Sequence, residues 1–142
     1  MLKVKAKLLV FDKPDLNGHI FPKDCKITLP DNAPILTPDS DPIMNKKQAA
    51  GIAANFVRND ECIVFDGYIH SKDEDAYKQV IKDPGLYCGG FYNGVKRHKE
   101  NGLEVIDSMN LRSIGLYYSD VYGDESLRLE IVEDENERKT ES

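Results

Sequence analysis

Apolar and polar residues alternate over residues 2–10, and a period of two is typical of a strand with one buried face. The apolar positions of this alternation are Val4, Ala6, Leu8 and Val10. A second alternating segment at 52–56 and an apolar run at 62–69 are separated by Asn59 and Asp60, which are common turn residues. We therefore predict a first strand and, later in the chain, a β-hairpin that turns at Asn59-Asp60.

One segment has helical periodicity instead. Its apolar residues recur four positions apart and are Ala76, Tyr77, Val80 and Ile81. Ser71 lies three residues before Glu74, which is the spacing of a capping box. Pro84-Gly85 then ends the pattern. These signals predict a helix over 72–82 whose apolar stripe packs into the core.

The chain after residue 85 carries strand signals only, with turn residues at Asn93-Gly94 and Asn101-Gly102. The strands expected there are 86–95, 103–107, 111–121 and 126–132. The basic cluster at 96–99 is expected on an exposed hairpin tip. Together with the earlier elements, these strands predict a mainly β (α+β) fold, an antiparallel barrel of about seven strands with one helix.

Prolines gather early in the chain, where six of the seven lie between Pro14 and Pro42. Each proline lacks a main-chain donor and disfavours helical geometry in the residue before it. We therefore predict an extended proline-rich arm over 13–46, with short strands at 25–29 and 34–36. An irregular segment of this length in a small domain is typical of a functional or interaction element.

The last ten residues, 133–142, contain five acidic and two basic residues and no aliphatic or aromatic one. Such a segment cannot bury enough apolar surface to offset the entropy lost on ordering. The predicted organisation is a single β-barrel domain over 1–132, which includes the arm, followed by a flexible acidic tail.

The composition is that of one soluble domain, with 142 residues, 40% hydrophobic and 31% charged. The net charge of −6 argues against a nucleic-acid partner, because binding to phosphates needs a basic face. No apolar run approaches the roughly 18 residues of a membrane span. The first ten residues also lack the continuous apolar stretch of a signal peptide, so no membrane partner is expected.

The cysteines, Cys25, Cys62 and Cys88, are odd in number and have no C-x-x-C spacing. This pattern disfavours a disulfide framework and a zinc site, and it predicts buried thiols in a reducing compartment. The histidines are not paired at i, i+4 either. We expect no metal and no cofactor.

Three separated segments carry the motifs of one family. Residues 17–22 read NGHIFP, which is similar to an N-G-R-(I/V)-Y-P stretch. Residues 33–56 lead from an apolar-Pro start into a G-x-A-x-x-F strand. The third segment has two parts. Residues 88–91 read CGGF, which is similar to S-(I/V)-G-F, and residues 111–116 read LRSIGL, which is similar to L-x-E-(V/I)-S-L. In their order these segments resemble the capsid-maturation (prohead) proteases of tailed bacteriophages, which are related in fold to the herpesvirus assemblins.

The resemblance implies a nucleophile, a base and a group that orients the base, and each matching position departs from the family pattern. Asp39 or Ser40 stands where the family has its histidine, and a carboxylate with a pKa of about 4 is a poor base for a hydroxyl. Cys88 replaces the serine nucleophile, and Ser113 replaces the acidic member. If the alignment holds, Cys88 and Ser113 lie within reach of each other on adjacent strands, with Asp39 or Ser40 nearby.

Because all these positions are degenerate, no catalytic residue is expected. The resemblance then implies an auxiliary (cementing or decoration) protein of a phage virion, an inactive prohead-protease-like fold that is made in the host cytoplasm. Its partner would be the major capsid protein lattice, and it could also associate with itself there. Two alternatives stay open. One is an active maturation protease with Cys88 as nucleophile and His19, His70 or His98 as base, and the other is an assembly scaffold or chaperone.

Overall fold

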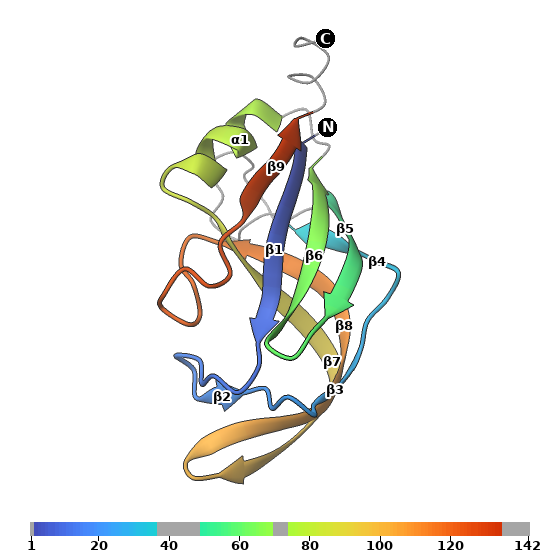
Figure 1. Ribbon diagram of the computed structural model, residues 1–142, viewed down its shortest axis with the longest axis vertical. Coiled ribbons are helices and arrows are strands. Elements are labelled where there is room, and N and C mark those ends of the chain that lie inside the picture. The colour runs from blue at the N-terminus through green and yellow to red at the C-terminus, as the bar shows by residue number, and fades with distance from the viewer. Residues whose placement is uncertain (1, 37–48, 70–73, 135–142) are drawn as a thin grey trace.

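In the described part of the chain, nine strands form one sheet that curls into a half-barrel, with a helix at one end (Figure 1). The computed structural model describes residues 2–36, 49–69 and 74–134. The elements are β1 (Leu2–Val10), β2 (His19–Ile20), β3 (Lys26–Thr28), β4 (Asn32–Leu36), β5 (Ala49–Arg58), β6 (Cys62–Ile69), α1 (Glu74–Lys82), β7 (Tyr87–Glu100), β8 (Leu103–Tyr117) and β9 (Glu130–Asp134). The predicted mainly β fold with a barrel-like sheet and a single helix is confirmed.

Strand β8 is paired along both of its edges. The main path of the sheet runs β2-β8-β4-β5-β6-β1-β9, and β3 and β7 also pair with β8. β7 is antiparallel to β8 over nearly its whole length. The three short strands of the arm therefore occupy the opposite edge, and they run parallel to β8. The prediction of an antiparallel barrel is corrected at this edge, because an arm that cannot form a helix satisfies its main-chain groups along β8.

The first strand and the central hairpin are confirmed. β1 pairs with β6 in an antiparallel ladder that places Val4 opposite Gly67, and β6 pairs with β5 on its other side. The turn between β5 and β6 is held by the Asn59 side chain. Its Oδ1 accepts the main-chain N–H groups of Glu61 at 2.8 Å and of Cys62 at 2.9 Å, as expected for an Asx-type turn.

Helix α1 buries Tyr77 and Ile81, two members of the predicted apolar stripe. It ends as the sequence predicts, because the Gly85 N–H donates to the carbonyl oxygen of Val80 at 2.9 Å and Gly85 has a φ of 110°. The predicted helix start at residue 72 and the capping residue Ser71 lie outside the described residues.

The strand boundaries after residue 85 differ from the prediction. β7 and β8 form one long hairpin that turns at Asn101-Gly102, and β8 is continuous where a break was predicted. Asn93-Gly94 is a bulge within β7, since the register shifts between Asn93 and Lys96 and Gly94 has a φ of 60°. The predicted turn at Asn93-Gly94 is therefore a bulge, because β7 pairs with β8 both before and after it.

The final strand begins and ends later than predicted. β9 starts at Glu130 and continues to Asp134, where it pairs with β1. Glu133 and Asp134 thus belong to the sheet and not to the predicted tail. The remaining tail residues, 135–142, lie outside the described residues.

The core is one cluster of buried side chains from the sheet and from α1. Its largest fully buried members include Leu2, Leu8, Phe65, Tyr77, Ile114 and Leu116. Burial of each such side chain contributes about 1.5–3 kcal/mol. This cluster joins the sheet and α1 in one core.

The segment between β8 and β9 is folded around the buried carboxylate of Asp120. Its Oδ1 accepts the main-chain N–H of Tyr122 at 2.7 Å, and its Oδ2 accepts the main-chain N–H of Leu127 at 2.5 Å. Leu127 in turn accepts the main-chain N–H of Cys88 at 3.0 Å. Asp120 therefore joins the loop to the start of β7.

We predict that Asp120→Ala lowers the free energy of unfolding by about 2–4 kcal/mol, because two buried N–H donors lose a charged acceptor. Asp120→Asn, which keeps one acceptor oxygen, should lose less. Chemical denaturation monitored by circular dichroism measures both, with the exposed Asp31→Ala as control. Equal stability of Asp120→Ala and the control would contradict this role.

Candidate functional site

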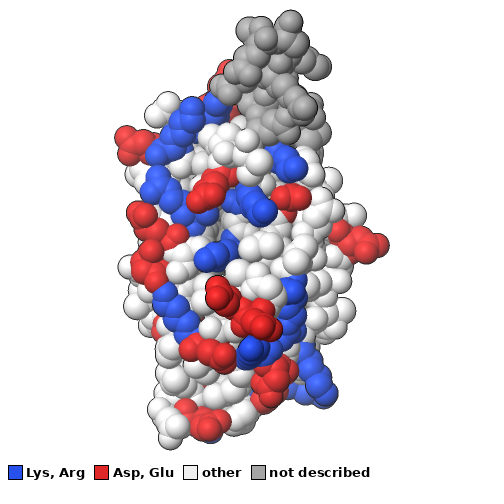
Figure 2. Space-filling model, in the orientation of Figure 1, with Lys and Arg blue, Asp and Glu red and all other residues white. Residues whose placement is uncertain are grey.

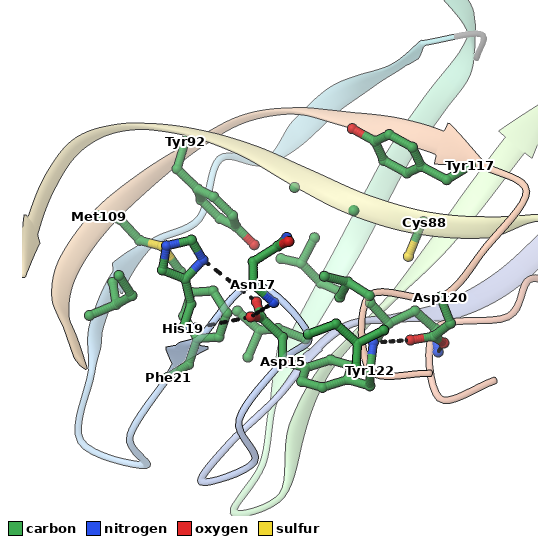
Figure 3. Close-up of a pocket in the computed structure, with 18 of the residues that line it drawn as sticks. Asp15, Asn17, His19, Phe21, Cys88, Tyr92, Met109, Tyr117, Asp120 and Tyr122 are labelled. Carbon is green, nitrogen blue, oxygen red and sulfur yellow. Dashed lines mark hydrogen bonds and ion pairs between the residues drawn. The ribbon is translucent and has the colours of Figure 1, made fainter. Parts of the chain in front are cut away.

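A cavity of about 580 Å³ opens at the end of the half-barrel (Figure 3). One wall is the inner face of the β7–β8 ribbon. The facing walls are the end of β1, the start of the proline-rich arm and the loop between β8 and β9. The volume is within the range of ligand pockets, and the mouth of a barrel is a common place for one.

The deep part of the cavity is apolar. Its lining there includes Leu8, Leu9, Phe21, Ile106, Met109 and Leu127. Most of these side chains belong to the core or pack directly against it. The cavity therefore offers a ligand an apolar surface that is formed by core side chains.

Polar groups gather on one side of the cavity, where the chain turns from β1 into the arm (Figure 3). Asp15 holds this turn. Its Oδ1 accepts the main-chain N–H groups of Asn17 and His19 at 2.9 Å each, and its Oδ2 lies 3.7 Å from the His19 Nδ1. The Asp15 side chain is only 6% exposed. The Asn17 amide and the His19 ring are thus presented to the cavity by a fixed carboxylate.

Tyr92 forms the roof of this polar side. Its phenol folds over Gly90, where a β-carbon would lie 2.3 Å from the Tyr92 hydroxyl oxygen, so only glycine leaves room for the ring. Phe21 packs against the ring at 6.3 Å between centroids. Burial raises the pKa of Tyr92 well above its usual range, so the hydroxyl enters the cavity as a neutral donor.

Cys88, the predicted nucleophile position, lies in the cavity wall but its thiol is already engaged. The side chain is 3% exposed, and its Sγ donates to the carbonyl oxygen of Lys7 at 2.9 Å. Burial raises the pKa of this thiol, which disfavours the reactive thiolate. Among the described residues no histidine ring bonds to the sulfur, and the His19 ring faces Asp15 instead.

The expected approach of Cys88 and Ser113 is not found. The two residues are on adjacent strands, as predicted, but Cys88 pairs with Leu116 and Ser113 pairs with Phe91. Because side chains alternate along a strand, they project from opposite faces of the ribbon. The surroundings of Gly115 agree with this. Gly115 is two residues from Ser113 and so shares its face of the strand, and a β-carbon on Gly115 would contact the Phe91 ring, which is on that face. Asp39 and Ser40 lie outside the described residues.

The basic cluster at 96–99 is exposed beside the hairpin turn, as predicted. His98 lies between two carboxylates, with its Nδ1 2.8 Å from Asp107 and its Nε2 3.2 Å from Glu100. Arg97 pairs with Glu104 at 3.1 Å. On the face shown in Figure 2, Lys and Arg side chains are interspersed with Asp and Glu, so that face carries no extended field of one sign.

Sequence reasoning missed the polar side of the cavity. Asp15 and Tyr92 belong to none of the motifs described above, and Asn17 appears there only as the first residue of the NGHIFP stretch. Within the described ranges, no cluster of three His, Cys, Asp or Glu side chains could hold a metal ion. In the same part of the chain, no helix is long and apolar enough to cross a membrane.

The comparisons with known proteins supply no relative. No protein-family model, curated protein or solved structure matches the chain. The fold and the cavity therefore define the molecule only as a mixed β half-barrel with a preformed pocket at its open end.

We predict that none of the three cysteines reacts quickly in the folded protein, because each is buried. Burial raises the pKa of Cys25 to about 11 and also raises that of Cys88. Reaction with an aromatic disulfide reagent at neutral pH should be slow in buffer and complete within seconds in denaturant. Rapid labelling of Cys88 in the folded protein, located by mass spectrometry, would show a reactive thiol instead.

We predict a raised pKa for His98, because the hydrogen bond to Asp107 and then the one to Glu100 favour the protonated ring. A raised pKa in the folded state means that this stabilisation is complete below the unfolded pKa of about 6.5 and is lost as pH rises through the folded pKa. NMR titration of the ring should give a lower pKa in Asp107→Asn than in the native chain. The distant Asp31→Asn serves as control, and an unchanged titration in Asp107→Asn would refute the pairing.

Proposed function

We propose that the chain is a non-enzymatic binding protein, an auxiliary (cementing or decoration) component of a tailed-phage capsid. The observation that carries the non-enzymatic part is the state of Cys88. Its thiol is buried, has a raised pKa and donates to Lys7. A cysteine nucleophile needs the opposite environment, which is an accessible thiolate next to a base.

The capsid part of the proposal comes from the resemblance of four short motifs to the prohead proteases. The mainly β half-barrel is compatible with it, although fold alone does not define function. The opposite faces of Cys88 and Ser113 contradict the catalytic alignment of these two positions. The capsid part therefore rests on the similarity and order of the short motifs, and not on a shared site. The partner would be the major capsid protein, and the site of action would be the virion.

One arrangement favours the rival function, a maturation protease. Cys88, His19 and Asp15 all line the same cavity, and these are the side-chain types of a cysteine-histidine-carboxylate triad. Catalysis would require the His19 ring, whose Nδ1 lies 3.7 Å from Asp15 Oδ2, to reach the Cys88 sulfur with its other nitrogen. In the observed geometry the sulfur bonds to Lys7 instead.

The test begins with the genes beside the one that encodes this chain, among which we expect a major capsid gene. We expect co-expression of the two proteins to give particles in which this chain is present at a fixed ratio to the capsid protein, measured by quantitative mass spectrometry. A chain that is absent from the purified particles would contradict the decoration function.

Intact-mass analysis of the same particles tests the rival. Capsid and scaffold proteins should have identical masses when they are co-expressed with the native chain or with Cys88→Ala, because no cleavage depends on the thiol. A truncated capsid or scaffold protein that is restored to full length in Cys88→Ala would establish the protease in place of the binding protein.

A further inference from the structure

The half-barrel is closed on one side of Cys88 and open on the other. At the start of β7, the segment before β9 bridges the gap, because Cys88 N–H donates to Leu127 at 3.0 Å and Leu129 N–H donates to Leu86 at 2.9 Å. Beyond Cys88, β8 is the only strand that pairs with β7 in the described part of the chain. The cavity lies at this opening, beside the unpaired edge of β7.

The main-chain groups at this edge are those that an added strand requires. The Leu86 carbonyl and the Cys88 N–H point towards the 127–129 segment and are hydrogen-bonded to it. Because this direction alternates along a strand, Gly90 presents the next pair of outward groups. Gly90 also lines the cavity. The Tyr92 ring covers one face of Gly90, but the glycine has no side chain of its own beside the strand edge. An unpaired edge with access of this kind is the surface used in β-strand addition.

Exposed apolar side chains surround the mouth of the cavity. Leu16 is 74% exposed, Val95 is 42% exposed and Tyr117 is 39% exposed, and all three line the cavity. An apolar rim around an apolar cavity is typical of a site that a partner covers. Leu16 is held in this position because its main-chain N–H donates to Val121 at 2.8 Å.

Two lysines beside the mouth have no ion-pair partner among the described residues. Lys96 and Lys99 follow the cavity-lining part of β7, and neither ammonium group forms an ion pair with a described residue, whereas the neighbouring Arg97 and His98 do. An acidic segment would complement these two lysines. The chain's own residues 135–142 include acidic residues but no aliphatic or aromatic side chain that could fill the cavity.

We propose that the cavity and the free edge of β7 together bind an extended peptide segment of a partner protein, with a large apolar side chain in the cavity and acidic residues beside Lys96 and Lys99. Main-chain hydrogen bonds to Gly90 supply the pairing, and the Tyr92 hydroxyl and the Asn17 amide bond to the segment at the mouth. The inference rests on the proposed function only for the identity of the partner, a component of the capsid. The recognition chemistry itself is independent of it.

The probe is a fluorescein-labelled decapeptide with a central phenylalanine, β-branched residues two positions to either side and two glutamates at one end. We expect saturable binding by fluorescence anisotropy, with NMR shifts confined to the cavity lining and the β7 edge. Leu16→Asp should weaken binding at least about tenfold, because it places a charge on the apolar rim. Val57→Asp, at a residue that is 55% exposed on β5, is the matched control and should bind normally.

Two further variants separate the parts of the interaction. A peptide N-methylated at alternate residues should lose binding, because it cannot donate to the β7 edge. Exchange of both lysines, Lys96→Glu with Lys99→Glu, should weaken the glutamate peptide about threefold or more and favour a peptide with lysines in place of the glutamates. Circular dichroism confirms that each variant is folded.

Absence of binding at about 1 mM peptide, the weak limit of specific recognition, would overturn the proposal, as would binding that Leu16→Asp leaves intact. Dimerisation of the free chain that Leu16→Asp abolishes would overturn it in favour of a second copy as occupant. The capsid function fails separately. If the chain binds the peptide but is absent from purified particles, the capsid role is refuted and the peptide site stands. If Leu16→Asp still binds particles, this site is refuted and the capsid role stands.

Discussion

The two-sided pairing of β8 is the constraint on which the rest of the structure depends. β8 is antiparallel to β7 along one edge, and along the other it carries β2, β3 and β4 in parallel. This arrangement explains how an arm rich in proline becomes part of the sheet, since its few free main-chain groups find partners on a strand that is already fixed. It also sets the cavity, because the ribbon and the arm form facing walls only when both are anchored to β8.

The local elements could be predicted from the sequence, and the way they join could not. The alternation that ends at Val10, the turn at Asn59 and the helix stop at Gly85 each depend on residues close in sequence, and all three are found. Asn93-Gly94 carries an equally strong local signal, yet it became a bulge because the strand resumes its pairing with β8. A two-residue strand such as β2 has no periodicity, so its parallel pairing is not encoded in any local pattern.

The candidate site was also only partly predicted, because its residues come from distant parts of the chain. Cys88 was identified from the sequence, but its burial and its bond to Lys7 depend on a residue far away in the chain. The expected partnership with Ser113 failed because a shift of one residue turns a side chain to the opposite face of a strand, and short motifs do not determine parity across two strands. Tyr92 belongs to none of the sequence motifs, and its place over Gly90 depends on the folded strand.

The thiol of Cys88 has a structural role that accounts for its place in the cavity wall. β1 and β7 are not paired as strands in the described sheet, yet they approach each other where the Sγ donates to the Lys7 carbonyl. A thiol is small enough to be buried there, and it is a weak donor that can bond to a main-chain carbonyl oxygen. On one side of this contact the 127–129 segment closes the barrel, and on the other the edges separate. The position of Cys88 therefore marks where the seam ends and where a partner's backbone could begin.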